Sequence, residues 1–324
     1  MIVNFSFLNS KNGMYYYAQD YVGLLNHSDV INVGELNVRT SPYKKILNII
    51  YIYYLAWCRG EFVYTPTIHP LPWINNQLVI CHDSYPFKGP KGRLKKLLLM
   101  LSLMSSKCNV AYINKSDSRC FVDSLNLSDS RKIFFPNLIK PIEPDIGQFE
   151  VNVELDIVNI ALVGTDSDKK RYEFLFDTIL NRHEELKDKF KFHIYGGYNS
   201  YCELIFQKYS AKLNLIWCDP QKSSLFDLLK SANVVISVAR NEGFGRPIAF
   251  SLQLGLPTML IDDQTFVEFF SNAAYIFKNE ASLIDSIIDI VCNHKYKPYP
   301  TQSFILEQNE AISKFVVLVN YNNY

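Results

Sequence analysis

Short apolar runs of strand length alternate along most of the chain with longer stretches of helical period. Because parallel strands need a long connection, usually a helix, this alternation predicts α/β domains with doubly wound parallel sheets. In the first half, the expected strands are residues 2–8, 30–33, 61–65, 78–81, 109–113 and 132–135. The expected helices between them are residues 15–25, 43–57, 92–105 and 116–125.

The pattern stops once and then starts again. Pro136, Pro141 and Pro144 lie in a stretch with little periodicity, which is typical of a linker. After it, strands are expected at residues 158–163, 191–195, 213–217, 234–238 and 258–261, and helices at residues 172–182 and 225–230. A chain of 324 residues is long enough for two buried cores. We therefore expect two Rossmann-like domains, residues 1–145 and 146–303, and a last helix within residues 304–324 that can dock across the linker on the first domain.

Charge and cysteine content argue against several classes of protein. The 33 Lys and Arg residues against 32 Asp and Glu residues leave a net charge of +1, which disfavours a nucleic-acid partner. The 7 cysteines are far apart and form no CxxC pair, so neither a disulfide framework nor a zinc site is expected. No signal peptide opens the sequence, and no apolar run approaches the ~20 residues of a spanning helix. We expect a cytoplasmic protein without a metal cofactor.

The strongest local signal is the segment of residues 238–248, with the sequence VARNEGFGRPI. An apolar strand runs into a glycine-bearing loop, and a proline suits the first turn of a helix, whose N–H groups attract anions. Gly243 and Gly245 let a ligand approach the backbone, while Arg240 and Arg246 add positive charge. The segment therefore predicts a phosphate-binding loop.

Glu242 lies in the same loop and would repel a phosphate, unless it accepts hydrogen bonds from neutral hydroxyl groups such as those of a sugar. The combination predicts a sugar joined to a phosphate as the ligand. The alternative is a tight turn with a solvated glutamate, since short glycine motifs also occur without function.

Residues 242–247, with the sequence EGFGRP, resemble the E-G-F-G-x-P segment that opens the E-x7-E motif of retaining GT-B glycosyltransferases of family 4. The resemblance runs in order over roughly residues 1–270. Its other matches are Asn12-Gly13, Val79-Ile80-Cys81-His82-Asp83, Phe135-Pro136-Asn137, Val163-Gly164, Tyr195-Gly196-Gly197, Trp217-Cys218-Asp219-Pro220 and residues 225–238.

The resemblance implies a GT-B fold, two domains facing a central cleft, and metal-independent transfer with retention at the anomeric carbon. Glu242 would orient the donor sugar, and His82 with Asp83 would complete the catalytic residues from the N-terminal domain. The alternatives are a buried, satisfied histidine at His82 and a loop or helix cap at Asp83. The implied contacts to the donor and its phosphates are Lys170, Arg171, Gly243, Phe244, Gly245, Arg246, Gly13, Gly164 and Thr165.

Two positions depart from the family pattern. The second acidic position of E-x7-E falls on Phe250, which cannot accept hydrogen bonds from ribose hydroxyls. Thr165 stands where a basic residue usually follows the first glycine of the second domain. Lys170, with Arg171 close behind, is then the preferred contact to a diphosphate.

Residues 88–104 place basic and apolar side chains together on an expected helix. Such a helix can lie on an anionic membrane. The alternative is a solvated basic face over an apolar stripe that faces the core. The cations of this segment are Lys88, Lys91, Arg93, Lys95 and Lys96.

The resemblance indicates a retaining hexosyltransferase that uses a nucleotide-sugar, with UDP favoured over GDP. The acceptor would be a hydroxyl of a lipid-linked glycan in bacterial surface polysaccharide synthesis, of O-antigen or capsule. One alternative is an epimerase or hydrolase of nucleotide-sugars with the same architecture. Another is a catalytically idle subunit that supports a partner transferase, which Phe250 and Thr165 favour.

Overall fold

The structure is a computed structural model that describes residues 1–8, 12–25, 30–34, 42–88, 91–140, 142, 157–165 and 168–321. The chain forms two compact units. The first contains Met1–Leu138 and the C-terminal segment from Gln302, and the second contains Ile139–Thr301. Of the expected linker, Pro141 and Pro144 lie outside the described residues.

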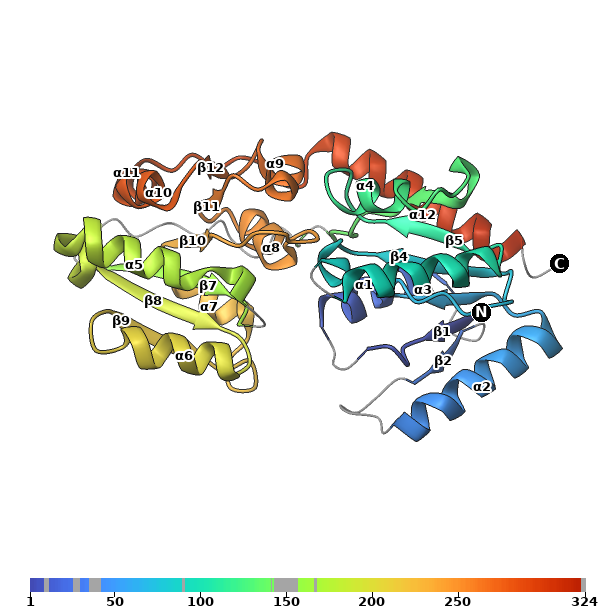
Figure 1. Ribbon diagram of the computed structural model, residues 1–324. Helices are drawn as coiled ribbons and strands as arrows, with labels where there is room; N and C mark the ends of the chain where they lie inside the picture. Colours follow the sequence, from blue (N-terminus) through green and yellow to red (C-terminus); the bar gives the residue numbers. More distant parts are fainter. Residues whose placement is uncertain are drawn as a thin grey trace. The chain divides into compact units, whose positions relative to one another are not determined.

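The first unit is built on a six-stranded parallel sheet with the order β2-β1-β3-β4-β5-β6 (Figure 1). Its strands are β1 Ile2–Asn4, β2 Ile31–Val33, β3 Val63–Thr65, β4 Gln77–Cys81, β5 Asn109–Tyr112 and β6 Lys132–Phe134. Its helices are α1 Gly13–Val22, α2 Pro42–Arg59, α3 Gly92–Met104, α4 Ser118–Asp123 and α12 Gln302–Tyr321, with short 3-10 turns at Tyr85–Phe87 and Asp129–Arg131. The parallel α/β architecture predicted from the alternating pattern is confirmed.

Strand register assigns the helices of this unit to the two faces of the sheet. Ile2 pairs with Val63 in register, so their side chains share a face. The buried residues of α2 and α3 pack on that face, α2 against Ile2 and Val63 and α3 against Val79 and Val110. The opposite face carries Tyr64, whose ring lies 5.6 Å from that of Phe315 in α12.

The second unit repeats this design with the strand order β12-β11-β10-β7-β8-β9, again all parallel. Its strands are β7 Val158–Val163, β8 Phe190–Tyr195, β9 Asn214–Cys218, β10 Val234–Ser237, β11 Thr258–Ile261 and β12 Tyr275–Phe277. Its helices are α5 Tyr172–Arg182, α6 Ser200–Tyr209, α7 Leu225–Ser231, α8 Arg246–Gln253, α9 Gln264–Phe270, α10 Glu280–Asp285 and α11 Ile287–Asn293. Short 3-10 segments cover Asp168–Lys170 and Glu184–Lys189.

Two buried clusters cover the faces of the second sheet. One joins the strands to α5, α6, α10 and α11, and the other joins them to α7 and the end of α8. β7 and β10 are central neighbours in this sheet. Because both strands run in the same direction, the loops that follow them meet at one edge.

Most differences from the sequence expectations are at element ends. The first strand ends at Asn4 rather than at residue 8, because Ser6 turns back and donates its backbone N–H to the Asn4 side chain. The helical and strand patterns also left β12 and the short helices α6, α9, α10 and α11 unassigned. These elements have three to ten residues, which is too short for a clear period.

Candidate functional site

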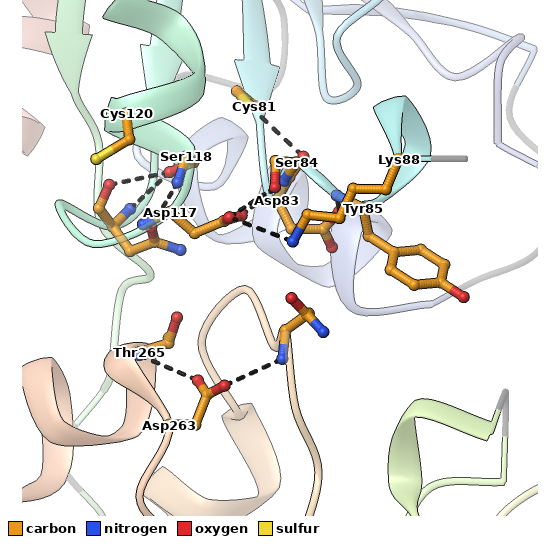
Figure 2. Close-up of polar contacts among 12 residues, drawn as sticks. Cys81, Asp83, Ser84, Tyr85, Lys88, Asp117, Ser118, Cys120, Asp263 and Thr265 are labelled. Carbon is orange, nitrogen blue, oxygen red and sulfur yellow. Dashed lines mark hydrogen bonds and ion pairs between the residues drawn. The ribbon is translucent and has the colours of Figure 1, made fainter. Parts of the chain in front are cut away.

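The loop after β10 has the backbone that its glycines permit. Gly245, which precedes the first residue of α8, has φ of +99°, and a Cβ there would lie 3.0 Å from the Ile248 side chain. Another residue would be strained at this φ. Asn241 is also left-handed, with φ of +59°, and its N–H donates to the Asp263 carboxylate at 3.1 Å. The carboxylate of Asp263 also accepts from the N–H of Thr265 at 3.1 Å, which ties the loops after β10 and β11 together (Figure 2).

Glu242 is held by two lysines from the segment after β7. Its Oε1 lies 2.8 Å from Nζ of Lys170, and its Oε2 lies 3.7 Å from Nζ of Lys169. The three side chains are only 13–16% exposed. The loops also join through the backbone, since the N–H of Arg240 donates to the carbonyl of Lys169 at 3.1 Å. The glutamate is therefore an ion-paired group and not the solvated turn residue of the alternative interpretation.

The electrostatics of this cluster favour an ionised carboxylate. Burial alone would raise the pKa of the Glu242 carboxyl, but the charges and hydrogen bonds of Lys170 and Lys169 outweigh it and hold the pKa below its usual value. The cluster therefore holds two ammonium groups and one carboxylate close together. A ligand at this edge would thus meet both cations and the oxygens of a fixed carboxylate.

Arg171 is placed differently from its neighbour Lys170. Its backbone is left-handed, with φ of +57°, and it caps the start of α5. Its guanidinium pairs with Glu280 of α10 at 2.7 Å and lies 4.5 Å from the centre of the Phe174 ring. Of the two residues predicted to meet a diphosphate, Lys170 is the one beside Glu242.

Thr165 has a structural task at the end of β7. Its hydroxyl donates to the carbonyl of Gly197 at 2.5 Å, and the residue is only 4% exposed. A Cβ on Gly196 would lie 2.5 Å from this hydroxyl oxygen, so the turn after β8 requires glycine. The carbonyl of Gly164 accepts a hydrogen bond from Tyr172 at 2.6 Å. The threonine thus joins the loops after β7 and β8, at the position where the family pattern has a basic residue.

The other residues of the motif lie on α8 and around its start. Phe244 is buried, with its ring 4.7 Å from that of Phe269, so it anchors the loop to α9. Arg246 is the first residue of α8. Phe250 is partly buried and packs against the apolar cluster that contains Leu254 and Leu256. An apolar environment therefore surrounds the position of the second acidic residue.

His82 and Asp83 follow β4 in the first unit. Nε2 of His82 lies 2.9 Å from the carbonyl of Pro66, and since a carbonyl only accepts, this nitrogen carries a proton. The rings of Tyr17 and His82 form a T-shaped pair, with the ring centres 4.9 Å apart. The Asp83 carboxylate accepts the N–H of Tyr85 at 3.1 Å. Both side chains thus have fixed orientations at the carboxyl end of their strand.

Sequence reasoning missed Asp117, which lies close to these residues. Its carboxylate accepts both the N–H and the hydroxyl of Ser84 at 2.6 Å, and Lys88 lies 3.9 Å away (Figure 2). The only available signal was its place at the start of the expected helix of residues 116–125, shortly after the expected strand of residues 109–113. Gly13 begins α1 beside the capping residue Asn12, and a Cβ on Gly13 would have open space around it.

Among the residues that the structure describes, no three His, Cys, Asp or Glu side chains form a group that could hold a metal ion. Within the same residues, no helix is long and apolar enough to cross a membrane.

Comparison with solved structures identifies the fold that this architecture defines. HepE from Anabaena, in complex with UDP and glucose, has a TM-score of 0.65 at 11% identity, over 99% of this chain and 96% of that one. WaaG, a glycosyltransferase involved in lipopolysaccharide biosynthesis, gives the same TM-score and identity over 99% and 95%. The two parallel Rossmann-like sheets are those of the GT-B glycosyltransferase fold, as predicted.

The second unit also matches a known family of proteins. Residues 150–300, which include Lys170 and Glu242, match the family described as Glycosyl transferases group 1. This match confirms the resemblance to the glycosyltransferases of family 4. No curated protein gives a significant match. A TarM mutant from S. aureus, in complex with Fondaparinux, alpha-GlcNAc-glycerol and UDP, has a TM-score of 0.58 at 14% identity over 84% of this chain. The chain spans 59% and 55% of the length of the two TarM chains that it matches.

Proposed function

We propose that this protein is a retaining, metal-independent glycosyltransferase that moves a hexose from a nucleotide-sugar to a hydroxyl of a glycan acceptor. The observation that carries the proposal is the pairing of Glu242 with Lys170 and Lys169 at the edge where β7 and β10 end. It puts cations for a diphosphate and a fixed acceptor for sugar hydroxyls within one small cluster. The match of residues 150–300 to the group 1 glycosyl transferases supports the same conclusion.

The chemical demand of this reaction is to stabilise the diphosphate as it leaves the sugar. Lys170, supported by Lys169 and Arg171, neutralises the developing charge, and the N–H groups at the start of α8 add to the attraction. Glu242 accepts hydrogen bonds from the sugar hydroxyls and so orients the donor. Gly243, Phe244, Gly245 and Arg246 shape the loop around the phosphates, with Gly164 and Thr165 at the end of β7 and Gly13 in the first unit.

His82 and Asp83 act from the first unit in this proposal. The imidazole donates from Nε2 to Pro66, which fixes the ring and the tautomer. The histidine then contacts the transferred sugar, and Asp83 completes the catalytic group.

A UDP-sugar is the proposed donor, in preference to a GDP-sugar. UDP is present in the solved complexes of HepE and TarM, which share the fold. A lipid-linked glycan of a bacterial surface polysaccharide, such as O-antigen or capsule, is the proposed acceptor, and WaaG acts in lipopolysaccharide biosynthesis. The protein works in the cytoplasm and contacts the anionic membrane through Lys88, Lys91, Arg93, Lys95 and Lys96.

A thermal-shift screen across UDP-sugars and GDP-sugars, with and without EDTA, tests the proposal. A ligand at about 100 times its dissociation constant adds about 2.7 kcal/mol of apparent stability. We expect a UDP-sugar to raise the unfolding temperature equally with and without EDTA, and the same donor to support transfer. A shift without transfer or with free sugar as the product favours the epimerase or hydrolase alternative. No shift with any nucleotide favours the idle subunit.

A further inference from the structure

The outer side of α2 is apolar and exposed to solvent. Only Ile52 and Leu55 of its 18 residues are buried. The residues on the outer side recur at intervals of mostly three and four, and they are 47–70% exposed: Tyr43, Ile46, Leu47, Ile50, Tyr51, Tyr54 and Trp57. An apolar stripe with this period normally faces the core of a soluble domain. On α2 the larger apolar surface faces away from it.

The same is true of α3. Leu99 and Leu103 are the core residues of this helix, whereas Leu97 and Leu98 are 53% and 56% exposed. The full exposed stripe is Leu94, Leu97, Leu98, Leu101 and Met104. A solvated basic face above a core-facing stripe therefore does not describe α3.

The two stripes lie on one face of the first unit. α2 and α3 cover the same face of the sheet, as the strand register shows, and the loop between β3 and β4 contacts both helices. In that loop Pro72 accepts a hydrogen bond from Tyr53 of α2 at 2.9 Å, and Trp73 donates its N–H to Ser105 after α3 at 3.2 Å. Trp73 is 68% exposed, and its φ of +60° is rare for a bulky residue. We call the two stripes with Trp73 the α2–α3 face.

The part of the chain that carries this face is strongly basic, which favours an anionic partner. Residues 42–107 contain nine lysines and arginines but only two acidic residues, Glu61 and Asp83. Glu61 is paired with the N-terminal amine at 2.8 Å, and neither α2 nor α3 contains an acidic residue. The nine cations are Lys44, Lys45, Arg59, Lys88, Lys91, Arg93, Lys95, Lys96 and Lys107. A second copy of the chain would bring like charges together across a two-fold interface.

We propose that the α2–α3 face binds the surface of an anionic membrane, with its Tyr, Trp and Leu side chains in the headgroup region. Tyrosine and tryptophan are enriched at that depth, and lysine and arginine are attracted to anionic headgroups. The inference deepens the membrane contact of the proposed function by adding α2 and Trp73 to the basic segment. Binding to lipid does not depend on sugar transfer.

Cosedimentation with vesicles of phosphatidylcholine, with and without phosphatidylglycerol, tests this inference. The variant Ile46→Gln/Ile50→Gln/Trp57→Gln removes three side chains of the stripe that are 56–62% exposed and therefore contribute little to the folded core. The matched control is Leu306→Gln/Val317→Gln, which changes side chains of α12 that are 60% and 55% exposed. α12 packs on the opposite face of the same sheet.

We expect the wild type and the control to bind the anionic vesicles, and the triple variant to partition at least about ten-fold more weakly. Emission of the wild type should shift to the blue with anionic vesicles, and Trp57→Phe should reduce that shift. The inference is wrong if the triple variant sediments like the wild type, or if the wild type ignores phosphatidylglycerol. It is also wrong if the wild type forms dimers that the triple variant loses, because the face then binds a second copy. Thermal shift with UDP on each variant is a separate readout, since failure of the donor site abolishes that shift and leaves vesicle binding intact.

Discussion

The Glu242 carboxylate lies 2.8 Å from the Lys170 ammonium, although 72 positions separate the two residues in the chain. Glu242 follows β10 and Lys170 follows β7, and these two strands are hydrogen-bonded neighbours. Both residues therefore lie beyond the carboxyl ends of their preceding strands. Lys169 completes the cluster from 3.7 Å. The ion pair therefore depends on the sheet order of the second unit and links the EGFGRP loop to the segment after β7.

Glu242→Gln should abolish most of the sugar transfer. The amide keeps the shape of the side chain but loses the charge, and a hydrogen bond to a charged group contributes about 1.5–3 kcal/mol. We expect transfer to fall at least about ten-fold while UDP affinity is not reduced, because both lysines remain. Steady-state kinetics and calorimetry measure the two quantities. Glu310→Gln is the control, since its exposed pair with Lys314 is distant in sequence from the motif. Wild-type turnover in Glu242→Gln would remove this residue from the reaction.

The stability that Glu242 contributes should depend on pH. A carboxyl whose folded pKa is below its unfolded value of about 4.3 stabilises the fold above that unfolded value, and the contribution disappears as the pH falls through the folded pKa. Urea unfolding should show Glu242→Gln to be less stable than the wild type at neutral pH by about 1–2 kcal/mol. The difference should shrink below about pH 4. A difference that grows with acid would contradict the lowered pKa.

Replacing Arg171 should have two effects. Arg171→Ala leaves Glu280 without its partner at 2.7 Å, so the unfolding temperature should fall. We propose that the same change also lowers the affinity for UDP. The loss should be smaller than in Lys170→Ala, because Lys170 is the cation beside Glu242. Thermal unfolding and UDP titration of both variants decide this order. If Arg171→Ala lowers the UDP affinity more than Lys170→Ala does, the arginine is the principal phosphate contact.

Phe250→Glu should not restore a ribose site. The side chain packs against the cluster of Leu254 and Leu256, where an unpaired carboxylate pays a desolvation penalty. We expect a lower unfolding temperature and no gain in UDP affinity. Phe250→Leu is the matched control, because it keeps the packing apolar. A clear gain in affinity with glutamate would instead reveal an ordinary ribose site that has lost only its acidic residue.

The sheets and the Glu242 loop were predictable because their signals are local. Strand-length apolar runs separated by helical periods specify parallel sheets, and Gly245 lies at a loop position whose φ is +99°. The partners of each charged residue were not predictable. Lys170 and Arg171 are adjacent in sequence, yet one pairs with Glu242 and the other with Glu280.

The exposure of α2 and the role of Thr165 also could not be predicted from the sequence. A helical apolar period is the same whether the stripe faces the core or solvent, so the outward side chains of Ile50 and Trp57 gave no separate signal. At Thr165 the sequence revealed only that the basic residue of the family pattern is missing. Its hydrogen bond to Gly197 arises from the closeness of the turns after β7 and β8.

The central claim is that Lys170 and Lys169 bind the diphosphate of a nucleotide-sugar donor, and calorimetric titration with UDP and UMP tests it most directly. The variant is Lys169→Ala/Lys170→Ala, and the control is Lys208→Ala, whose side chain is 50% exposed and pairs with Asp177. The wild type and the control should bind UDP. In the double variant, the affinity for UDP should fall at least about ten-fold more than the affinity for UMP, because the lost charges act mainly on the second phosphate. A wild type that does not bind UDP, or a folded double variant in which UDP and UMP binding are weakened equally, would contradict the claim.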